Sequence, residues 1–328
     1  MKTILKAAAF VALVGVAACN KTANPAEDVD LSTDKALFKV DVNPPTKVTF
    51  SGEDLVWEGD ESIGILLGNS SSTSEAATHS TQELVSVEGT KGIFEGVVTL
   101  DKFTADDIKG IVYPFDVNHY YRLNGKSNRI VMTVATTTQI QKHNNVLNGK
   151  NTPMFCSLTK DDLMIKNGAY VVEGKQLSWG CALVRFNVYG VNPMMEDDEY
   201  LVSVTLHSAS GTALVGTSEW DYDAAAFRWN GKTFDPTVQL EEQVTIKDKT
   251  SENGVKVYMA LLNRGTYSLS EGSYVTVATN KSDYTMNLNT TIELNAGEVR
   301  KIGLDLSKFS CAEPNTLPAT TWIDEEVW

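Results

Sequence analysis

The stretch that decides the fold is Arg300-Lys-Ile-Gly-Leu-Asp-Leu306, near the end of the chain. In an extended chain, Ile302, Leu304 and Leu306 fall on one face, and the residues between them fall on the other. An apolar pattern with a period of two is typical of a strand that has one buried face. The stretch therefore predicts a β-strand at the side of a hydrophobic core.

Similar runs recur from residue 36 onward and are separated by Gly, Asn, Asp and Pro. They cover residues 37–42, 62–67, 96–100, 111–113, 130–135, 183–189, 201–206, 255–262, 273–279 and 291–294. Turn residues between short strands are typical of all-β proteins. Helical signals are weak, because 104–109 and 159–164 each begin with a threonine three residues before an acid and predict only a turn or two. We expect two β-sandwiches in series.

The length of 328 residues predicts about two domains. Two polar stretches, 68–81 and 139–151, are predicted to be surface loops, and the polar approach to Leu177 is predicted to end the first domain. We therefore divide the chain into five parts. They are a signal peptide (1–18), a tether (19–35), an N-terminal sandwich (36–177), a C-terminal sandwich (178–309) and a tail (310–328).

The first nineteen residues carry the features of an export signal. Lys2 and Lys6 precede an apolar run over residues 7–16, which is too short to span a bilayer, and Ala17-Ala18-Cys19 follows. The pattern resembles the bacterial lipobox, which implies that the Cys19 thiol is acylated and that the chain is cut before it. Acyl chains on one residue would hold the mature protein on a membrane. The alternatives are a secreted protein cleaved nearby and an uncleaved anchor.

The charge of the chain argues against some partners. The formal net charge is −14, and removal of the signal with its two lysines lowers it to −16. Nucleic acid and anionic lipid attract basic surfaces, so neither is expected as a partner. No later segment is long and apolar enough to predict a second membrane span.

Residues that could carry catalysis or bind a metal are scattered. Cys156, Cys181 and Cys311 lie in no metal-binding or redox motif, and we expect buried thiols, with a bridge between Cys156 and Cys181 as the alternative. The four histidines lie far apart, and the acidic clusters lack the spacing of a calcium loop. We predict no metal, no cofactor and no enzymatic activity. Paired carboxylates for glycoside hydrolysis are the exception to this reasoning, because such pairs meet only in the fold and leave no motif in the sequence.

One segment resembles a known family signature. Trp57-Glu-Gly59-Asp60-Glu-Ser-Ile63-Gly-Ile65 resembles the Trp-x-x-Gly-Asp-x-Ile-Gly motif of fimbrillin-like lipoproteins, although the spacing differs. Later segments follow in the family's order, at 92–96, 111–115, 151–155, 183–188 and 294–306. From its residues alone, Trp57 is predicted to be a core tryptophan at a strand–turn–strand corner. The chain is thus similar to the fimbrillin family of Bacteroidetes, which includes the Mfa-like pilus lipoproteins.

The resemblance implies a function in assembly. Such proteins are two transthyretin-like β-sandwiches that travel as lipoproteins to the outer membrane, where they polymerise into pili, cap them or anchor them. In polymerising members a strand leaves or is cleaved from one subunit, and a C-terminal strand of the neighbour replaces it. The implied partners are other pilus subunits, the outer membrane through lipid, and a ligand on a host or microbial surface. The implied location is the fimbrium at the cell surface.

Two segments of this chain are candidates for a role in that strand exchange, one as the donor strand and one as the cleavage site. In the β-prone decamer 319–328, Thr321, Ile323 and Val327 share one face and Trp322 and Trp328 share the other, with acids on both. The decamer predicts a donor strand or, alternatively, a strand on an edge of its own domain. Family members are cleaved after a basic residue, usually arginine, near the start of the first domain. Here the first arginine is Arg122, and Lys35 is the best-placed basic residue, so stalk, tip and anchor roles stay open.

A rival hypothesis is a surface lipoprotein that binds glycans without polymerising. Exposed aromatic side chains on one sheet or loop rim would favour this function. The candidates are Trp220, Tyr222 and Trp229, for which burial in a core is the alternative.

Overall fold

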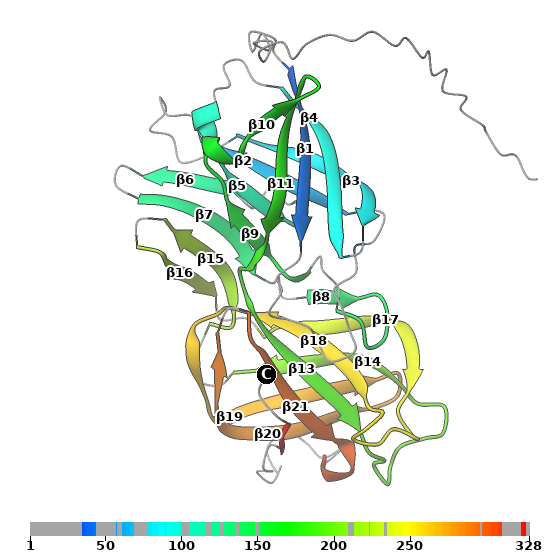
Figure 1. The fold of residues 1–328 in the computed structure, drawn as a ribbon. Coiled ribbons are helices and arrows are strands. Elements are labelled where there is room, and N and C mark those ends of the chain that lie inside the picture. The colour runs from blue at the N-terminus through cyan, green and yellow to red at the C-terminus, as the bar shows by residue number, and fades with distance from the viewer. Residues whose placement is uncertain are drawn as a thin grey trace, which may run out of the picture. The chain divides into compact units, whose positions relative to one another are not determined.

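The all-β prediction is confirmed by a computed structural model (Figure 1). The structure describes residues 35–43, 57, 61–68, 78–88, 90–99, 105–115, 120–124, 127–134, 138–147, 151–208, 213–222, 224–232, 235–295, 297–309 and 323–325. The 3₁₀ turns that lie entirely within these ranges are Ala105–Asp107, Lys160–Asp162 and Leu306–Lys308. The first two lie where the threonine–acid signals predicted a turn, and the backbone N–H of Thr159 donates to Asp162 at 2.8 Å.

The first sheet has nine strands in the order β10-β11-β1-β4-β3-β2-β5-β9-β12. Their bounds are β1 Lys35–Asn43, β2 Ser62–Leu67, β3 Thr78–Glu88, β4 Lys91–Thr99, β5 Ile108–Tyr113, β9 Met154–Ser157, β10 Met164–Lys166, β11 Ala169–Gln176 and β12 Ser178–Trp179. β1 lies between β11, to which it is parallel, and β4, to which it is antiparallel. Alternate residues of these strands, among them Phe38, Ile63 and Phe94, fill one hydrophobic cluster.

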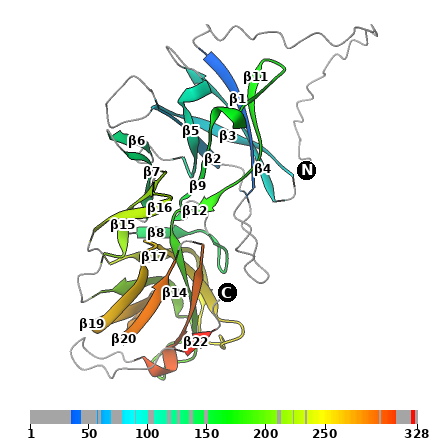
Figure 2. The same ribbon diagram turned by 60° about the vertical axis from the view of Figure 1, so that its left-hand side comes forward.

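A second cluster lies between two further sheets, ordered β18-β13-β21-β22 and β20-β19-β14-β17-β8. The strands are β8 Thr138–Gln141, β13 Ala182–Tyr189, β14 Tyr200–His207, β17 Thr237–Thr245, β18 Val255–Leu261, β19 Gly265–Thr279, β20 Asp283–Leu294, β21 Val299–Asp305 and β22 Ile323–Glu325. Figure 2 shows β19, β20 and β22 from a second side. Ile302, Leu304 and Leu306 are buried in this cluster, which confirms the alternation that predicted β21.

Strand β13 is buried along its whole length. Val184 and Phe186 enter the second cluster, whereas Leu183 on the other face enters the first. A strand covered on both faces reads as a continuous apolar run, and β13 is also parallel to its neighbour β21. This accounts for the run at 183–189, which alternates less clearly than β21 does.

Strand pairing crosses the predicted domain boundary at residue 177. The sheet β16-β15-β7-β6 joins β6 (Tyr120–Asn124) and β7 (Ser127–Val134) to β15 (Val215–Asp221) and β16 (Ala226–Lys232). Strand β8 likewise pairs in parallel with β17. Two sheets thus contain strands from both sides of residue 177. The division into domains 36–177 and 178–309 stays a prediction.

The prediction of a surface loop over 139–151 was wrong at its start. Residues Thr138–Gln141 form strand β8, and Gln139 and Gln141 are buried with 2% and 1% of their surface exposed. Polar composition suggested solvent, but both amides find partners on strand β18. Buried polar groups are tolerated when their hydrogen bonds are satisfied.

Candidate strand-exchange sites

The strand β1 occupies an interior position of the first sheet. Phe38, Val40 and Val42 point into the core and have no exposed surface. The Phe38 ring stacks on Tyr170 of β11 with ring centroids 5.1 Å apart. Removal of β1 would therefore open a slot between β4 and β11 with three adjacent apolar positions.

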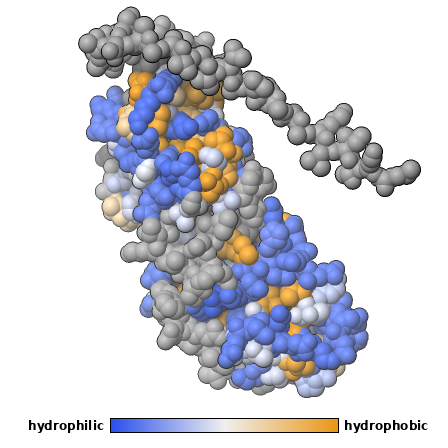
Figure 3. All heavy atoms as spheres, turned by 45° about the vertical axis from the view of Figure 1, so that its right-hand side comes forward, coloured by the Kyte–Doolittle hydropathy of each residue, from blue (hydrophilic) through white to orange (hydrophobic). Residues whose placement is uncertain are grey.

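The opposite face of β1 is polar at its centre and apolar near its start. Lys39 pairs with Glu95 at 2.7 Å, and Asp41 pairs with Lys91 at 3.0 Å. Leu37 lies directly opposite Val97 of β4, and these side chains are 44% and 55% exposed. Figure 3 shows hydrophobic patches among the hydrophilic residues of the surface. Ion pairs thus fix this face of β1, while apolar burial fixes the other.

Lys35, the candidate cleavage site, is the first residue of β1. Its backbone is paired with Thr99 of β4, so it lies in a strand and not in the tether predicted over 19–35. Cleavage there would require the start of β1 to leave the sheet. The role of Lys35 stays a prediction.

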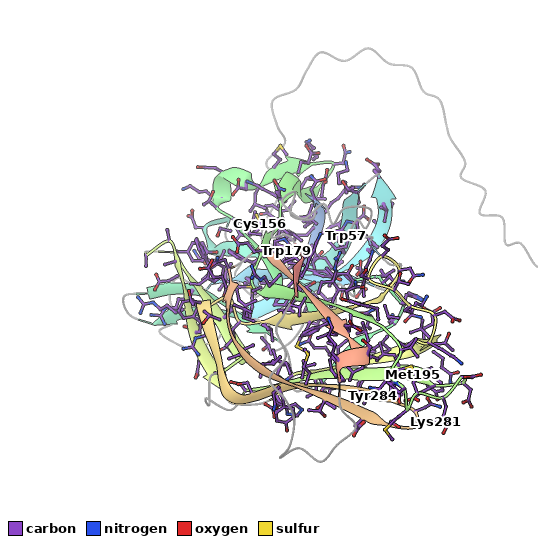
Figure 4. All side chains as sticks on the ribbon, turned by 90° about the horizontal axis from the view of Figure 1, so that it is seen from below. Trp57, Cys156, Trp179, Met195, Lys281 and Tyr284 are labelled. Carbon is purple, nitrogen blue, oxygen red and sulfur yellow. The ribbon has the colours of Figure 1, made fainter. Side chains whose placement is uncertain are left out.

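Trp57 lies in the core beside the β1 slot, as the sequence predicted (Figure 4). Its ring makes edge contacts with Phe94 and Tyr113, with centroids 5.3 Å and 5.2 Å away. Its Nε1–H donates to the carbonyl oxygen of Thr90 at 2.8 Å. Phe94 is the direct partner of Val40 across β4 and β1, so Trp57 supports the floor of the slot.

The tail contributes the short strand β22. Ile323, Asp324 and Glu325 lie opposite Gly303, Ile302 and Lys301 of β21, in antiparallel register. Among the described residues, the tail therefore pairs with its own sheet, which was the alternative to a donor strand. The other predicted tail residues Thr321, Trp322, Val327 and Trp328, and the lipidation site Cys19, lie outside the described residues.

Side-chain amides close the other edge of the same sheet. The Gln139 amide donates to the carbonyl oxygen of Ala260 at 2.9 Å and accepts from its N–H at 2.8 Å. The Gln141 amide donates to the carbonyl oxygen of Lys256 and accepts from the N–H of Tyr258, both at 2.9 Å. These side chains replace a neighbouring strand along β18. The sequence signal for them is the alternation Gln139-Ile-Gln141, which polar composition obscured.

The aromatic candidates for glycan binding separate into two groups. Trp220 packs on Phe155 and Phe227, and the Tyr222 hydroxyl donates to the carbonyl oxygen of Lys109. Trp229 is different because 42% of its surface is exposed. Its Nε1–H donates to Asn263 Oδ1 at 2.7 Å, which fixes the ring.

One trio has the order of a catalytic triad. Asp235 Oδ2 lies 2.9 Å from His207 Nδ1, and His207 Nε2 lies 3.2 Å from the hydroxyl of Thr276. Thr276 sits in mid-strand between partners on β14 and β20, so its surroundings offer the paired backbone of a sheet and not an oxyanion hole. We assign the trio a structural role on the face of the sheet.

Cysteine and metal chemistry are limited in the described part of the chain. Cys156 and Cys181 are free thiols, and burial raises the pKa of the Cys156 thiol to about 11. Among the described residues, no group of three His, Cys, Asp or Glu side chains is placed to hold a metal ion. No helix formed by those residues is long and apolar enough to cross a membrane.

The chain is similar to several solved structures at low sequence identity. A protein assigned to cell adhesion from Bacteroides ovatus is 11% identical with a TM-score of 0.47, over 88% of this chain and 96% of that chain. A fimbrial protein from Bacteroides vulgatus is 12% identical with a TM-score of 0.38, over 89% and 99%. The tip fimbrial protein Mfa3 from Porphyromonas gingivalis is 11% identical with a TM-score of 0.32, over 89% and 100%. No protein-family profile and no curated protein matches the sequence.

Proposed function

We propose that this protein is a pilus subunit or adhesin that is exported as a lipoprotein and assembles at the outer membrane by strand addition. The observation that carries the proposal is the position of β1, which begins at the candidate cleavage site Lys35 and fills an interior slot. Loss of this strand would expose three apolar positions that an extended strand from another subunit can fill. The lipobox at Cys19 and the ordered family motifs support the same function.

The chain's own tail is a poor match for that slot. The inward positions of β1 are Phe38, Val40 and Val42, which are consecutive on one face. In the tail, Glu325 interrupts the face of Ile323 and Val327, and two acids separate the tryptophans on the other face. A carboxylate in an apolar slot costs free energy unless it is paired. We infer that a strand from a related subunit fills the slot.

The experiment is the isolation of surface fibres from cells that express the chain. Sheared material should contain the protein in high-mass species that dissociate only on heating, and its N-terminal sequence should begin at Cys19 or just after Lys35. Cys19→Ser should abolish fatty-acid incorporation and membrane retention, because the thiol is the attachment point of the lipid. Absence of the chain from fibres would reject the assembly function, whereas unchanged lipid incorporation in the variant would reject the lipoprotein assignment.

Glycan binding without polymerisation is a second candidate function. One observation favours it, namely the exposed and fixed ring of Trp229 beside Asn263. A Trp229→Ala variant should lose binding to a glycan array if the ring is a sugar platform, while Trp229→Phe should retain part of it. Equal binding by the wild type and Trp229→Ala would remove this candidate.

A further inference from the structure

The exposed ring of Trp229 continues a face that is otherwise buried. Trp229 lies on β16, the edge strand of the sheet β16-β15-β7-β6. Phe227, two residues earlier on the same face, packs with Trp220 and Phe155 in an aromatic cluster. The Trp229 ring follows this cluster along the strand but is 42% exposed. A single exposed apolar side chain is ordinary on a protein surface, so exposure by itself indicates no function.

A buried amide holds this exposed ring in place. Asn263, which is 5% exposed, accepts the Trp229 Nε1–H on its Oδ1 at 2.7 Å, and the Ser218 hydroxyl donates to the same oxygen at 3.4 Å. Because an indole nitrogen can only donate, the amide oxygen must face it, and among the described residues Asn263 Nδ2 is left without an acceptor. A buried donor without a partner costs free energy. The molecule thus bears a local cost in order to fix a surface ring, which is expected where the position of the ring serves a function.

An arginine lies on the same side of β16 as the fixed ring. Arg264 is exposed, and its Nη1 donates to the carbonyl oxygen of Ala213 at 3.4 Å. Ala213 covers Gly231, which lies two residues after Trp229 on the same face, because a Cβ at Gly231 would lie only 2.3 Å from the Ala213 Cβ. The hydrogen bond to Ala213 therefore holds the Arg264 guanidinium on the side of β16 to which the Trp229 ring points.

Arg264 differs from the other arginines near this sheet in its partners. Arg129 and Arg228 point to the opposite face, where both pair with Asp221. Arg264, in contrast, has a carbonyl oxygen as its partner, and no carboxylate of the described residues pairs with it. The planar guanidinium of arginine binds a carboxylate through two parallel hydrogen bonds. The surface beside Trp229 therefore favours an anionic ligand over a neutral one.

We propose that Trp229 and Arg264 form a binding site for an acidic sugar, whose ring lies on the indole and whose carboxylate pairs with the guanidinium. The π face of an indole is electronegative and attracts the C–H groups of a sugar ring. A tryptophan that is already fixed offers this contact area at a small entropic cost. A sugar that carries a carboxylate matches both groups at once. The inference deepens the second candidate function, glycan binding, on which it rests, and it is independent of strand addition at β1.

The test is an array of uronic-acid and sialic-acid oligosaccharides, each beside its neutral methyl ester, probed with the chain without its signal peptide. The wild type should bind at least one acid about tenfold more tightly than its ester, because the ester lacks the charge that pairs with Arg264. Arg264→Gln should weaken binding of that acid about tenfold and remove the preference. Arg228→Gln, on the opposite face of β16, is the matched control and should bind like the wild type. Trp229→Ala should lose the acid and the ester, whereas Trp229→Phe should bind both more weakly and keep the preference.

The possible outcomes separate the site from the function on which it rests. Thermal melting checks that each variant is folded, and little change is expected because both arginines and Trp229 are exposed. Equal binding of acids and esters, or an Arg264→Gln variant that keeps the preference, would overturn the acidic site and leave glycan binding standing. Absence of binding to every sugar would overturn both. A triglutamate peptide that binds as tightly as the sugar acid would overturn the proposal in favour of a general attraction of anions.

Discussion

The first and the last strands of the described chain are held in opposite ways. β1 has two neighbours in its sheet and three apolar side chains with no exposed surface, whereas β22 has one neighbour and three residues. Release of β1 would expose a hydrophobic slot, and release of β22 would uncover only part of a sheet edge. Loss of β1 would therefore cost far more buried apolar contact and strand pairing than loss of β22.

The two edges of the sheet β18-β13-β21-β22 are also covered in different ways. The β18 edge is closed by glutamine amides from a distant segment, and in the described residues β22 covers the β21 edge from Lys301 to Gly303. Edge strands are protected in natural proteins because they invite pairing between chains. Here side-chain amides close one edge, and a short strand of the chain's own tail covers part of the other.

The largest effect is expected at β1. Phe38→Ala should lower the free energy of unfolding by about 3 to 5 kcal/mol, because it removes a fully buried ring from the slot. Leu37→Ala on the exposed face of the same strand is the matched control and should cost much less. Urea unfolding measures both. Similar losses for the two variants would break the distinction between the faces of β1.

A comparable loss is expected beside the slot. Trp57→Ala should destabilise the protein by about 3 to 5 kcal/mol, since the ring packs on Phe94 and Tyr113. Assembly would then fail through loss of folding. A variant with wild-type melting that fails to assemble would instead show that Trp57 is a contact to another subunit.

The β18 edge should tolerate less change than the β21 edge. The double variant Gln139→Ala, Gln141→Ala leaves buried peptide groups of β18 without partners, and we expect a loss of about 2 to 4 kcal/mol and a tendency to associate. Gln239→Ala, at an exposed glutamine of β17, is the control. Light scattering and urea unfolding measure the two effects. A monomeric double variant with unchanged stability would show that the amides do not protect this edge.

A smaller, pH-dependent effect is expected at β11, the neighbour of β1. Burial raises the pKa of Asp162, but Lys175 of β11 and the Thr159 N–H outweigh it and hold the pKa below its usual value. A lowered pKa contributes stability above the unfolded pKa of about 3.9, and that stability is lost as the pH falls through the folded pKa. Asp162→Asn should cost about 1 kcal/mol or less at pH 7, and the difference from wild type should vanish near pH 2. A difference that persists in acid would exclude an electrostatic cause.

Local pattern predicted the strands but not all of their partners. The alternation at β21, the core position of Trp57 and the two 3₁₀ turns follow from periodicity, side-chain size and capping, which are local properties. The buried role of Gln139 and Gln141 was missed because it depends on the backbone of β18, more than a hundred residues away in sequence. For the same reason the sequence left the tail with two alternatives. The register of Ile323–Glu325 with β21 agrees with the edge-strand alternative, and the donor strand stays a prediction.

The most direct test of the account is the removal of residues 319–328, followed by thermal melting and fibre formation on the same protein. The account predicts a folded chain whose melting temperature falls by no more than about 4 °C, because three residues of edge pairing are lost, and which still enters fibres, because a strand from a related subunit fills the β1 slot. A truncated chain that no longer enters fibres would contradict the inference that a related subunit supplies the exchanged strand. A chain that unfolds on truncation would show that β22 is a fixed part of the sandwich.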